Sequence, residues 1–223
     1  MMPPALTLAG VAVEPGRAAT PYWLTSDRVS AASGYDTRTM LHSLIDQVSK
    51  GSNLLLNIVP MADGTIPCDQ RSILLGMQDW LGRFGEAIQA TRVWSTYGEG
   101  PTQMGGGLLA APRAGTPQDI RFTRTQDNTV LYATTLGWQG GTTTITTLGA
   151  NRINLGNLAS VQLLDSTAGR YVNLTGHHQD GGLHITMPSL NPPFIALAYV
   201  FKLTFTGQIP VLGAPTAAER TTR

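Results

Sequence analysis

The sequence contains a single cysteine, Cys68, among 223 residues. One thiol excludes a disulfide within the chain and a zinc site built from several thiolates. The four histidines do not show a spacing typical of a metal site. They are His42, His177, His178 and His184. We expect His177 and His178 to form an exposed loop pair, and nothing in the sequence implies a metal, nucleotide or organic cofactor.

The sequence also lacks an excess of either positive or negative charge. The chain has 15 basic and 14 acidic side chains and a formal net charge of +1. Because no basic cluster stands out, nothing favours binding to nucleic acid or to an anionic membrane. Residues 1–16 are mildly apolar but lack a basic start, and Gly and Pro interrupt them. We therefore expect neither a signal peptide nor a membrane span there, and such a start is more typical of a position inside a longer gene.

Apolar residues are plentiful. They make up 42% of the chain against 13% charged residues, which is enough for a packed core. The length suits one large domain or two small ones.

Two segments in the first part of the chain have helical periodicity. Residues 37–50 and 68–84 each place apolar side chains on one side of a helix, so the pattern predicts two helices. Thr37 is placed to cap the first helix, and Gly51 to end it.

A nearly continuous apolar run, residues 53–59, lies between these helices and is bounded by Gly-Ser and Pro60. Such a run is typical of a strand buried on both faces of a parallel sheet. Trp23 and Leu24 lie in a short stretch that suits the end of another strand, and Asp63-Gly64 indicates a turn. Strand, helix, strand, helix in this order predicts a βαβ pattern.

The second part of the chain, from about Trp94, is rich in Gly, Pro and Thr and loses helical periodicity. It holds short runs of strand-forming residues separated by turn residues, which predict an antiparallel sandwich. The runs are 120–123, 129–136, 143–148, 161–164, 170–174, 183–187 and 195–204. We expect residues 1–95 to form the first domain, 96–208 the sandwich, and 209–223 a disordered tail.

Residues 44–101 make the interpretation specific. The motifs VSKGSNLLLNIVPMADGTI, WLGRFGEAI and Trp94 follow one another in the order found in glycoside hydrolase family 29, the α-L-fucosidases, and the chain resembles the C-terminal part of such an enzyme. The resemblance extends over roughly residues 15–205. It implies the fold class α/β plus all-β: the last strands and helices of a (β/α) barrel, followed by an antiparallel β-sandwich.

The resemblance implies retaining hydrolysis of α-L-fucosides, with a fucosylated oligosaccharide or glycoconjugate as the substrate. That chemistry uses two carboxyl groups about 5 Å apart, which project from the C-terminal ends of barrel strands. No segment of this sequence matches the family motif that carries the nucleophile. Leu24 stands where much of the family has the acid/base Glu, and Ser33 stands where the family has an aromatic. Full-length relatives are often secreted or periplasmic, and the location of this chain stays open.

Four residues are candidates for the sugar site. Asp27 follows the first candidate strand and is the candidate catalytic carboxylate, although a turn-capping role is the simpler explanation. Trp23, Tyr35 and Asn57 are candidates for substrate binding, while Tyr35 also suits packing and Asn57 also suits hydrogen bonding to buried backbone.

Other conspicuous side chains have simpler explanations. Asp63 suits a turn, Asp46 a helix-surface position or a salt bridge, and Trp80 the core. Trp94 and Trp138 suit the domain junction or the sandwich, with carbohydrate binding as the alternative.

Two functions follow from these observations. One is a fucosidase-family enzyme that is active only if substitute carboxylates or a partner chain complete the site. The other is a non-catalytic structural or weakly carbohydrate-binding sandwich. About two of the eight strands of a barrel can come from this chain, so exposed strand edges also predict self-association.

Overall fold

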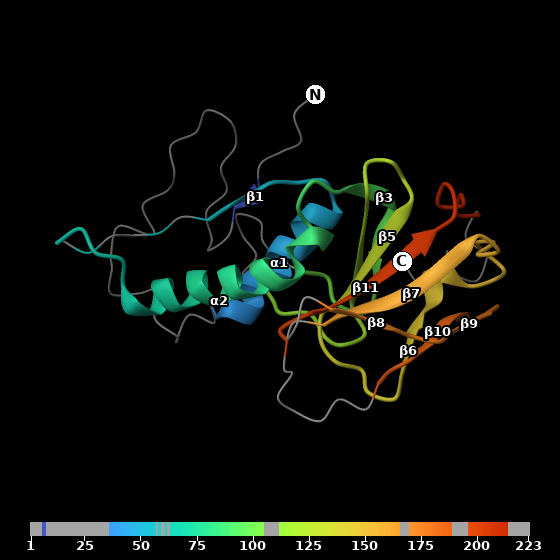
Figure 1. The fold of residues 1–223 in the computed structure, drawn as a ribbon. Coiled ribbons are helices and arrows are strands. Elements are labelled where there is room, and N and C mark those ends of the chain that lie inside the picture. The colour runs from blue at the N-terminus through green and yellow to red at the C-terminus, as the bar shows by residue number, and fades with distance from the viewer. Residues whose placement is uncertain are drawn as a thin grey trace.

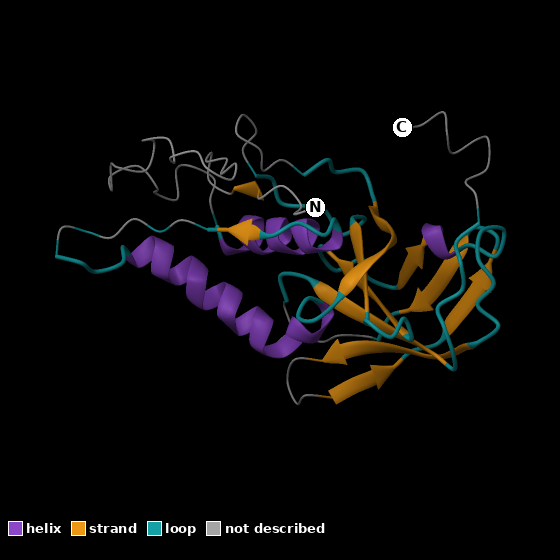
Figure 2. Ribbon diagram, turned by 90° about the horizontal axis from the view of Figure 1, so that it is seen from above, coloured by secondary structure: helices purple, strands orange, loops and turns teal. Residues whose placement is uncertain are grey.

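The computed structural model describes residues 6–7, 36–56, 58, 61, 63–104, 112–165, 170–188 and 196–213. These residues build three layers: two helices, a six-stranded sheet and a three-stranded sheet. Figures 1 and 2 show the two helices together on one side of the molecule and the strands of these two sheets on the other.

The two main helices match the predicted segments closely. Helix α1 is Thr37–Ser49 and helix α2 is Cys68–Phe84, which continues into the 3-10 turn η3 (Gly85–Ala87). The expected N-cap of α1 is wrong by one residue: Asp36, not Thr37, accepts the Thr39 N–H at 2.7 Å. A carboxylate at this position satisfies a backbone donor that the helix itself leaves unpaired. Gly51 follows α1 with a φ of +75°, as its predicted role at the helix end requires.

A short parallel pair of strands lies beside the helices. Strand β1 (Leu6–Thr7) pairs with β2 (Leu54–Leu55), with Leu6 opposite Leu54. Of the predicted strand 53–59, only Leu54 and Leu55 are hydrogen-bonded in a described strand. The parallel pairing is the one expected for this apolar run.

The remaining strands form two antiparallel sheets. In the larger sheet the order is β3 (Arg92–Glu99), β4 (Ile120–Arg124), β5 (Val130–Thr135), β11 (Tyr199–Phe205), β7 (Leu158–Asp165) and β8 (Arg170–Asn173). In the smaller sheet the order is β6 (Thr142–Ile145), β10 (Gly182–Thr186) and β9 (Gly176–Gln179). Every pairing in these two sheets is antiparallel.

The six-stranded sheet has apolar side chains on both faces. On β5, Leu131 and Ala133 point into the core between the two sheets, whereas Tyr132 belongs to the core under the helices. On β11, Phe201 belongs to the core between the sheets and Val200 to the core under the helices. Because neighbouring strand residues face opposite sides, this sheet is the middle layer that separates the two cores.

Two local differences from the sequence prediction concern the sandwich. His177 and His178 are not in a loop: they belong to β9, the edge strand of the smaller sheet, where His177 is exposed and His178 half-buried. The predicted strand 143–148 ends at Ile145, and Thr146–Leu148 form the 3-10 turn η4. The Glu99 carboxylate accepts the backbone N–H groups of Thr146 and Thr147 at 2.9 and 2.6 Å, which explains why the chain turns there.

The domain limits expected from the sequence stay predictions. Strand β3 spans residues 92–99 and so continues across position 95. Ile209 is buried and its N–H donates to the Asn128 carbonyl at 2.8 Å, so the described chain stays attached to the sandwich beyond residue 208. Residues 214–223 lie outside the described residues. Within the described ranges, no helix is long and apolar enough to cross a membrane.

Candidate functional site

The four residues predicted for the sugar site, Trp23, Asp27, Tyr35 and Asn57, lie outside the described residues. Their roles in catalysis and substrate binding therefore stay predictions. In the sequence, Asp36, the N-cap of α1, directly follows Tyr35, and β2 ends two residues before Asn57.

Asp63 holds a turn, as the Asp-Gly pair predicts. Its carboxylate accepts the Thr65 N–H at 2.9 Å and the Thr65 hydroxyl at 2.7 Å. These hydrogen bonds hold the pKa of Asp63 below its ordinary value. A carboxylate occupied in this way by its own turn has a structural role.

Asp46 forms a buried ion pair between α1 and the sheet. Its carboxylate is fully buried and accepts from Arg121 Nε on β4 at 2.6 Å and from Lys50 Nζ at 2.7 Å. Arg121 is 3% exposed and also donates to the carbonyls of Glu99 and Ile120 at 3.2 and 3.0 Å. The salt-bridge role predicted for Asp46 is confirmed, but the side chain is inside the protein rather than on the helix surface.

His42 is a second buried polar link between α1 and the strands. Its Nε2 lies 2.8 Å from the Leu197 carbonyl, and its Nδ1 accepts the Gly115 N–H at 3.0 Å. This pair of contacts requires a proton on Nε2 and none on Nδ1. Burial lowers the pKa of His42 to about 4, so the ring is neutral at pH 7.

Asp119 anchors the chain before β4. Its carboxylate accepts N–H groups of Thr102 at 2.8 Å and Thr116 at 2.7 Å, and the Thr116 hydroxyl at 2.7 Å. Burial alone would raise the pKa of Asp119, but these hydrogen bonds outweigh it and the pKa is lowered. The group is therefore an ionised structural anchor.

Glu86, from the predicted WLGRFGEAI motif, joins a cluster on the outer face of the six-stranded sheet. It accepts from the Tyr171 hydroxyl and pairs with Lys202 Nζ at 3.1 Å. Lys202 also lies 4.5 Å from the centre of the Tyr171 ring. Burial and the neighbouring Glu86 carboxylate raise the pKa of Tyr132, which keeps its phenol protonated. The cluster fixes η3 to β8 and β11.

The described carboxylates therefore serve the fold in most cases. Nine of them bind backbone N–H groups, hydroxyls or cations of the chain itself: Asp36, Asp46, Asp63, Asp69, Asp79, Glu86, Glu99, Asp119 and Asp127. A retaining glycosidase needs two carboxyl groups that face one sugar, and we identify no such pair in the described part. The described residues also contain no group of three or more His, Cys, Asp or Glu side chains arranged for a metal ion.

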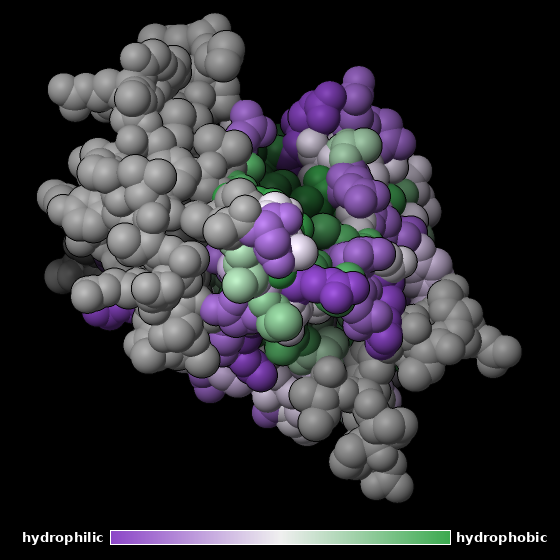
Figure 3. Space-filling model, turned by 90° about the vertical axis from the view of Figure 1, so that its left-hand side faces the viewer, coloured by the Kyte–Doolittle hydropathy of each residue, from purple (hydrophilic) through white to green (hydrophobic). Residues whose placement is uncertain are grey.

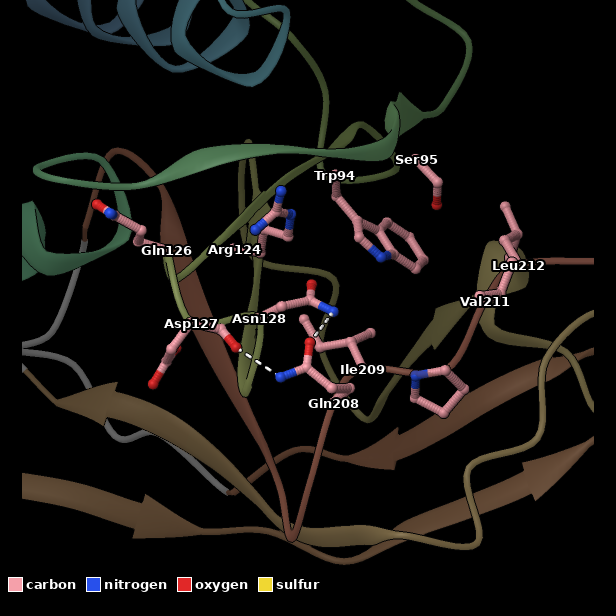
Figure 4. Close-up of a pocket in the computed structure, with 11 residues that line it drawn as sticks. Trp94, Ser95, Arg124, Gln126, Asp127, Asn128, Gln208, Ile209, Val211 and Leu212 are labelled. Atoms are coloured by element: carbon pink, nitrogen blue, oxygen red, sulfur yellow. Dashed lines mark hydrogen bonds between the residues drawn. The ribbon is translucent and has the colours of Figure 1, made fainter.

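A pocket of about 490 Å³ opens on the sandwich, away from the predicted sugar-site residues in sequence. Trp94 and Ser95 of β3, the turn between β4 and β5, and the segment after β11 line it (Figure 4). Trp94 belongs to the sandwich core at 9% exposure, and Trp138 packs against the same core, as the sequence indicated. The pocket could not be predicted from the sequence, because its lining residues come from three separate segments.

Comparison with known proteins defines the class. Residues 14–86 match the family described as alpha-L-fucosidase. The chain is 31% identical to human plasma alpha-L-fucosidase over 112 residues, which is 50% of this chain and 21% of that protein. It is 27% identical to rat tissue alpha-L-fucosidase over 183 residues, or 79% of this chain and 33% of that protein.

Solved structures agree. The Thermotoga maritima alpha-fucosidase in complex with fucose superposes with a TM-score of 0.58 at 29% identity, over 76% of this chain and 34% of that one. A family 29 alpha-L-fucosidase from Bacteroides thetaiotaomicron, at 17% identity and a TM-score of 0.52, shares the fold.

These similarities all point to one class of glycoside hydrolase. The chain is similar to the α-L-fucosidases, as its motifs predict, and it spans about a fifth to a third of the length of these relatives. The antiparallel sheets agree with the sandwich expected from the family.

Proposed function

We propose that this chain supplies the closing elements of a (β/α) barrel and the C-terminal sandwich of an α-L-fucosidase, and that fucoside hydrolysis needs further polypeptide. The observation that carries the proposal is the family match over residues 14–86, because this segment contains all four predicted sugar-site residues. The helices α1 and α2 are then the outer helices of the barrel, and β2 is one of its parallel strands.

The proposed reaction is retaining hydrolysis of an α-linked L-fucose. One carboxylate attacks the anomeric carbon, and a second carboxyl group protonates the leaving oxygen and later activates water. In the matched segment, Asp27 is the candidate for a catalytic carboxylate. The nucleophile has no matching motif in this sequence, so we expect these 223 residues alone to be inactive.

Exposed apolar side chains support the proposal that further polypeptide covers this part of the molecule. Of the large apolar residues exposed in the described part, four lie between the end of β2 and the first half of α2: Ile58, Met61, Ile66 and Leu75. Figure 3, viewed from the side where α2 begins in Figure 1, shows apolar side chains at the surface among polar ones. Surfaces of this kind are usually covered by a protein partner, here the rest of a barrel or a second copy of this chain.

An activity assay tests the catalytic part of the proposal. We expect the purified, folded monomer to release no nitrophenol from 4-nitrophenyl α-L-fucoside, whereas a full-length family member does so under the same conditions. Robust turnover by the pure monomer would show that the chain holds a complete carboxylate pair. In that case, an Asp27→Asn variant would establish whether Asp27 belongs to the pair.

Sedimentation equilibrium tests the association. We expect the chain to self-associate with rising concentration, and Leu75→Gln to weaken this because it removes exposed apolar surface. Val211→Gln is the matched control, since Val211 is 90% exposed but lies on the sandwich. Equal association by the two variants would exclude the first half of α2 as the contact surface.

A further inference from the structure

The pocket beside Trp94 lies outside the segment that matches the fucosidase family. Its walls come from β3, from the turn 126–128 and from residues 208–212. The volume of about 490 Å³ is within the range of small-molecule sites and too small for a folded partner.

Trp94 presents an unpaired donor to this pocket. The residue is only 9% exposed, and its ring packs edge-on against Phe122 at 5.2 Å, which fixes the orientation of the indole. Among the described residues, none accepts a hydrogen bond from the indole N–H. The nitrogen itself is not fully buried, so it is accessible to a ligand in the pocket. Figure 4 shows the indole nitrogen on the side of the ring that faces Asn128 and Ile209.

The opposite wall carries amide groups held in place. Asn128 Nδ2 donates to Gln208 Oε1 at 3.0 Å, and Gln208 Nε2 donates to the Asp127 carbonyl at 2.9 Å (Figure 4). Asn128 is in the left-handed backbone region, with a φ of +58°, and its carbonyl accepts the Ile209 N–H. Each side-chain amide therefore keeps a second N–H for a ligand while its position is already fixed, which lowers the entropic cost of binding.

The charges of the lining cancel. Arg124 contributes one cation, which donates to the Thr125 carbonyl at 3.1 Å and keeps further N–H groups, and Asp127 contributes one anion. A strongly charged ligand would meet an equal charge of its own sign. The combination of an indole, planar amides, a guanidinium and a carboxylate suits an uncharged ligand with several hydroxyl groups, because each hydroxyl both donates and accepts.

We infer that this pocket is a carbohydrate-binding site that accommodates a neutral sugar unit, with a sugar hydroxyl accepting from the Trp94 indole N–H and others contacting Asn128 and Gln208. None of the residues that line it is among those predicted for the catalytic sugar site. The pocket would hold a glycan on the sandwich whether or not the chain takes part in hydrolysis.

Nuclear magnetic resonance of the whole chain, labelled with ¹⁵N-tryptophan, tests the inference. The four tryptophans provide four indole signals, and Trp94→Phe and Trp138→Phe assign two of them. The probes are L-fucose, D-galactose and N-acetyl-D-glucosamine, with glycerol as a polyol control. We expect the Trp94 signal to shift saturably with at least one sugar and not with glycerol.

A variant on the opposite wall keeps the test independent of the core. Asn128→Gly retains the left-handed turn and removes the amide, so we expect sugar affinity to fall about fivefold, the typical effect of one hydrogen bond. Trp138→Phe, a substitution in the same core but outside the pocket, leaves the affinity unchanged. The inference is overturned if the Trp94 signal ignores all three sugars, if glycerol shifts it equally, or if Asn128→Gly binds as tightly as the parent chain.

Discussion

Replacing Asp46 with Asn isolates the energetic role of the buried link between the helices and the sheet. The substitution keeps the size of the side chain but removes the charge that pairs with Arg121 Nε at 2.6 Å. Arg121 stays charged, because its guanidinium does not lose a proton in proteins, and at 3% exposure it cannot reach water without moving.

The expected loss of stability follows from these contacts. Breaking a buried pair by removing one partner costs about 3–5 kcal/mol. The Glu99 and Ile120 carbonyls and the Tyr97 ring, 5.6 Å from the guanidinium carbon, continue to stabilise the Arg121 charge. We therefore expect the lower end, about 3 kcal/mol, which with a typical urea dependence lowers the unfolding midpoint by about 1–1.5 M.

Urea unfolding followed by circular dichroism measures this difference. Asp79→Asn is the matched control, because Asp79 pairs with Arg83 on the surface of α2, where both side chains are largely exposed; a cost below about 1 kcal/mol is expected there. Equal midpoints for the two variants would refute the reasoning. Replacing both Asp46 and Arg121 with apolar residues should recover much of the loss, since no charge is then left unpaired.

Two further predictions concern pH and helix packing. The pKa of His42 is about 4 in the folded state and near 6.5 in the unfolded state, so the unfolded state binds more protons between these pH values. The free energy of unfolding should therefore fall by up to about 3 kcal/mol as the pH drops from 6.5 to 4. Unfolding measured at several pH values should show this slope, and the slope should be smaller in His42→Gln. In α2, Gly82→Ala should raise the free energy of unfolding by about 1 kcal/mol because the space around it is open. Gly76→Ala should not show this increase in the free energy of unfolding, because its new methyl group would lie 2.5 Å from a Thr37 side-chain carbon. Comparable thermal unfolding midpoints for the two variants would contradict this account.

The helices and most sandwich strands were predictable because their signals are local. Apolar spacing placed α2 at Cys68–Phe84 and α1 to within one residue of its end. Asn128, in the predicted turn, has the left-handed backbone that Asp-Asn pairs favour. The motifs within residues 44–101 also pointed to the family with which the comparisons find similarity, because many residues match in order.

The buried polar contacts were not predictable in the same way. Asp46 and Arg121 are 75 positions apart, and their pairing exists only because α1 packs on the outer face of β4. Strand β9 was missed because Gly176–Gln179 contains polar residues at a sheet edge and lacks an apolar alternation. The pocket beside Trp94 likewise depends on segments that only the folded chain brings together.

The double-sided sheet also limits how this protein can be divided. A polypeptide that starts at residue 96 would lose the first half of β3 and both helices, and it would leave Tyr132, Leu136 and Val200 facing water. Such a product should aggregate or fold poorly. Evolution could therefore move this sandwich between genes only together with the helical layer that covers its outer side.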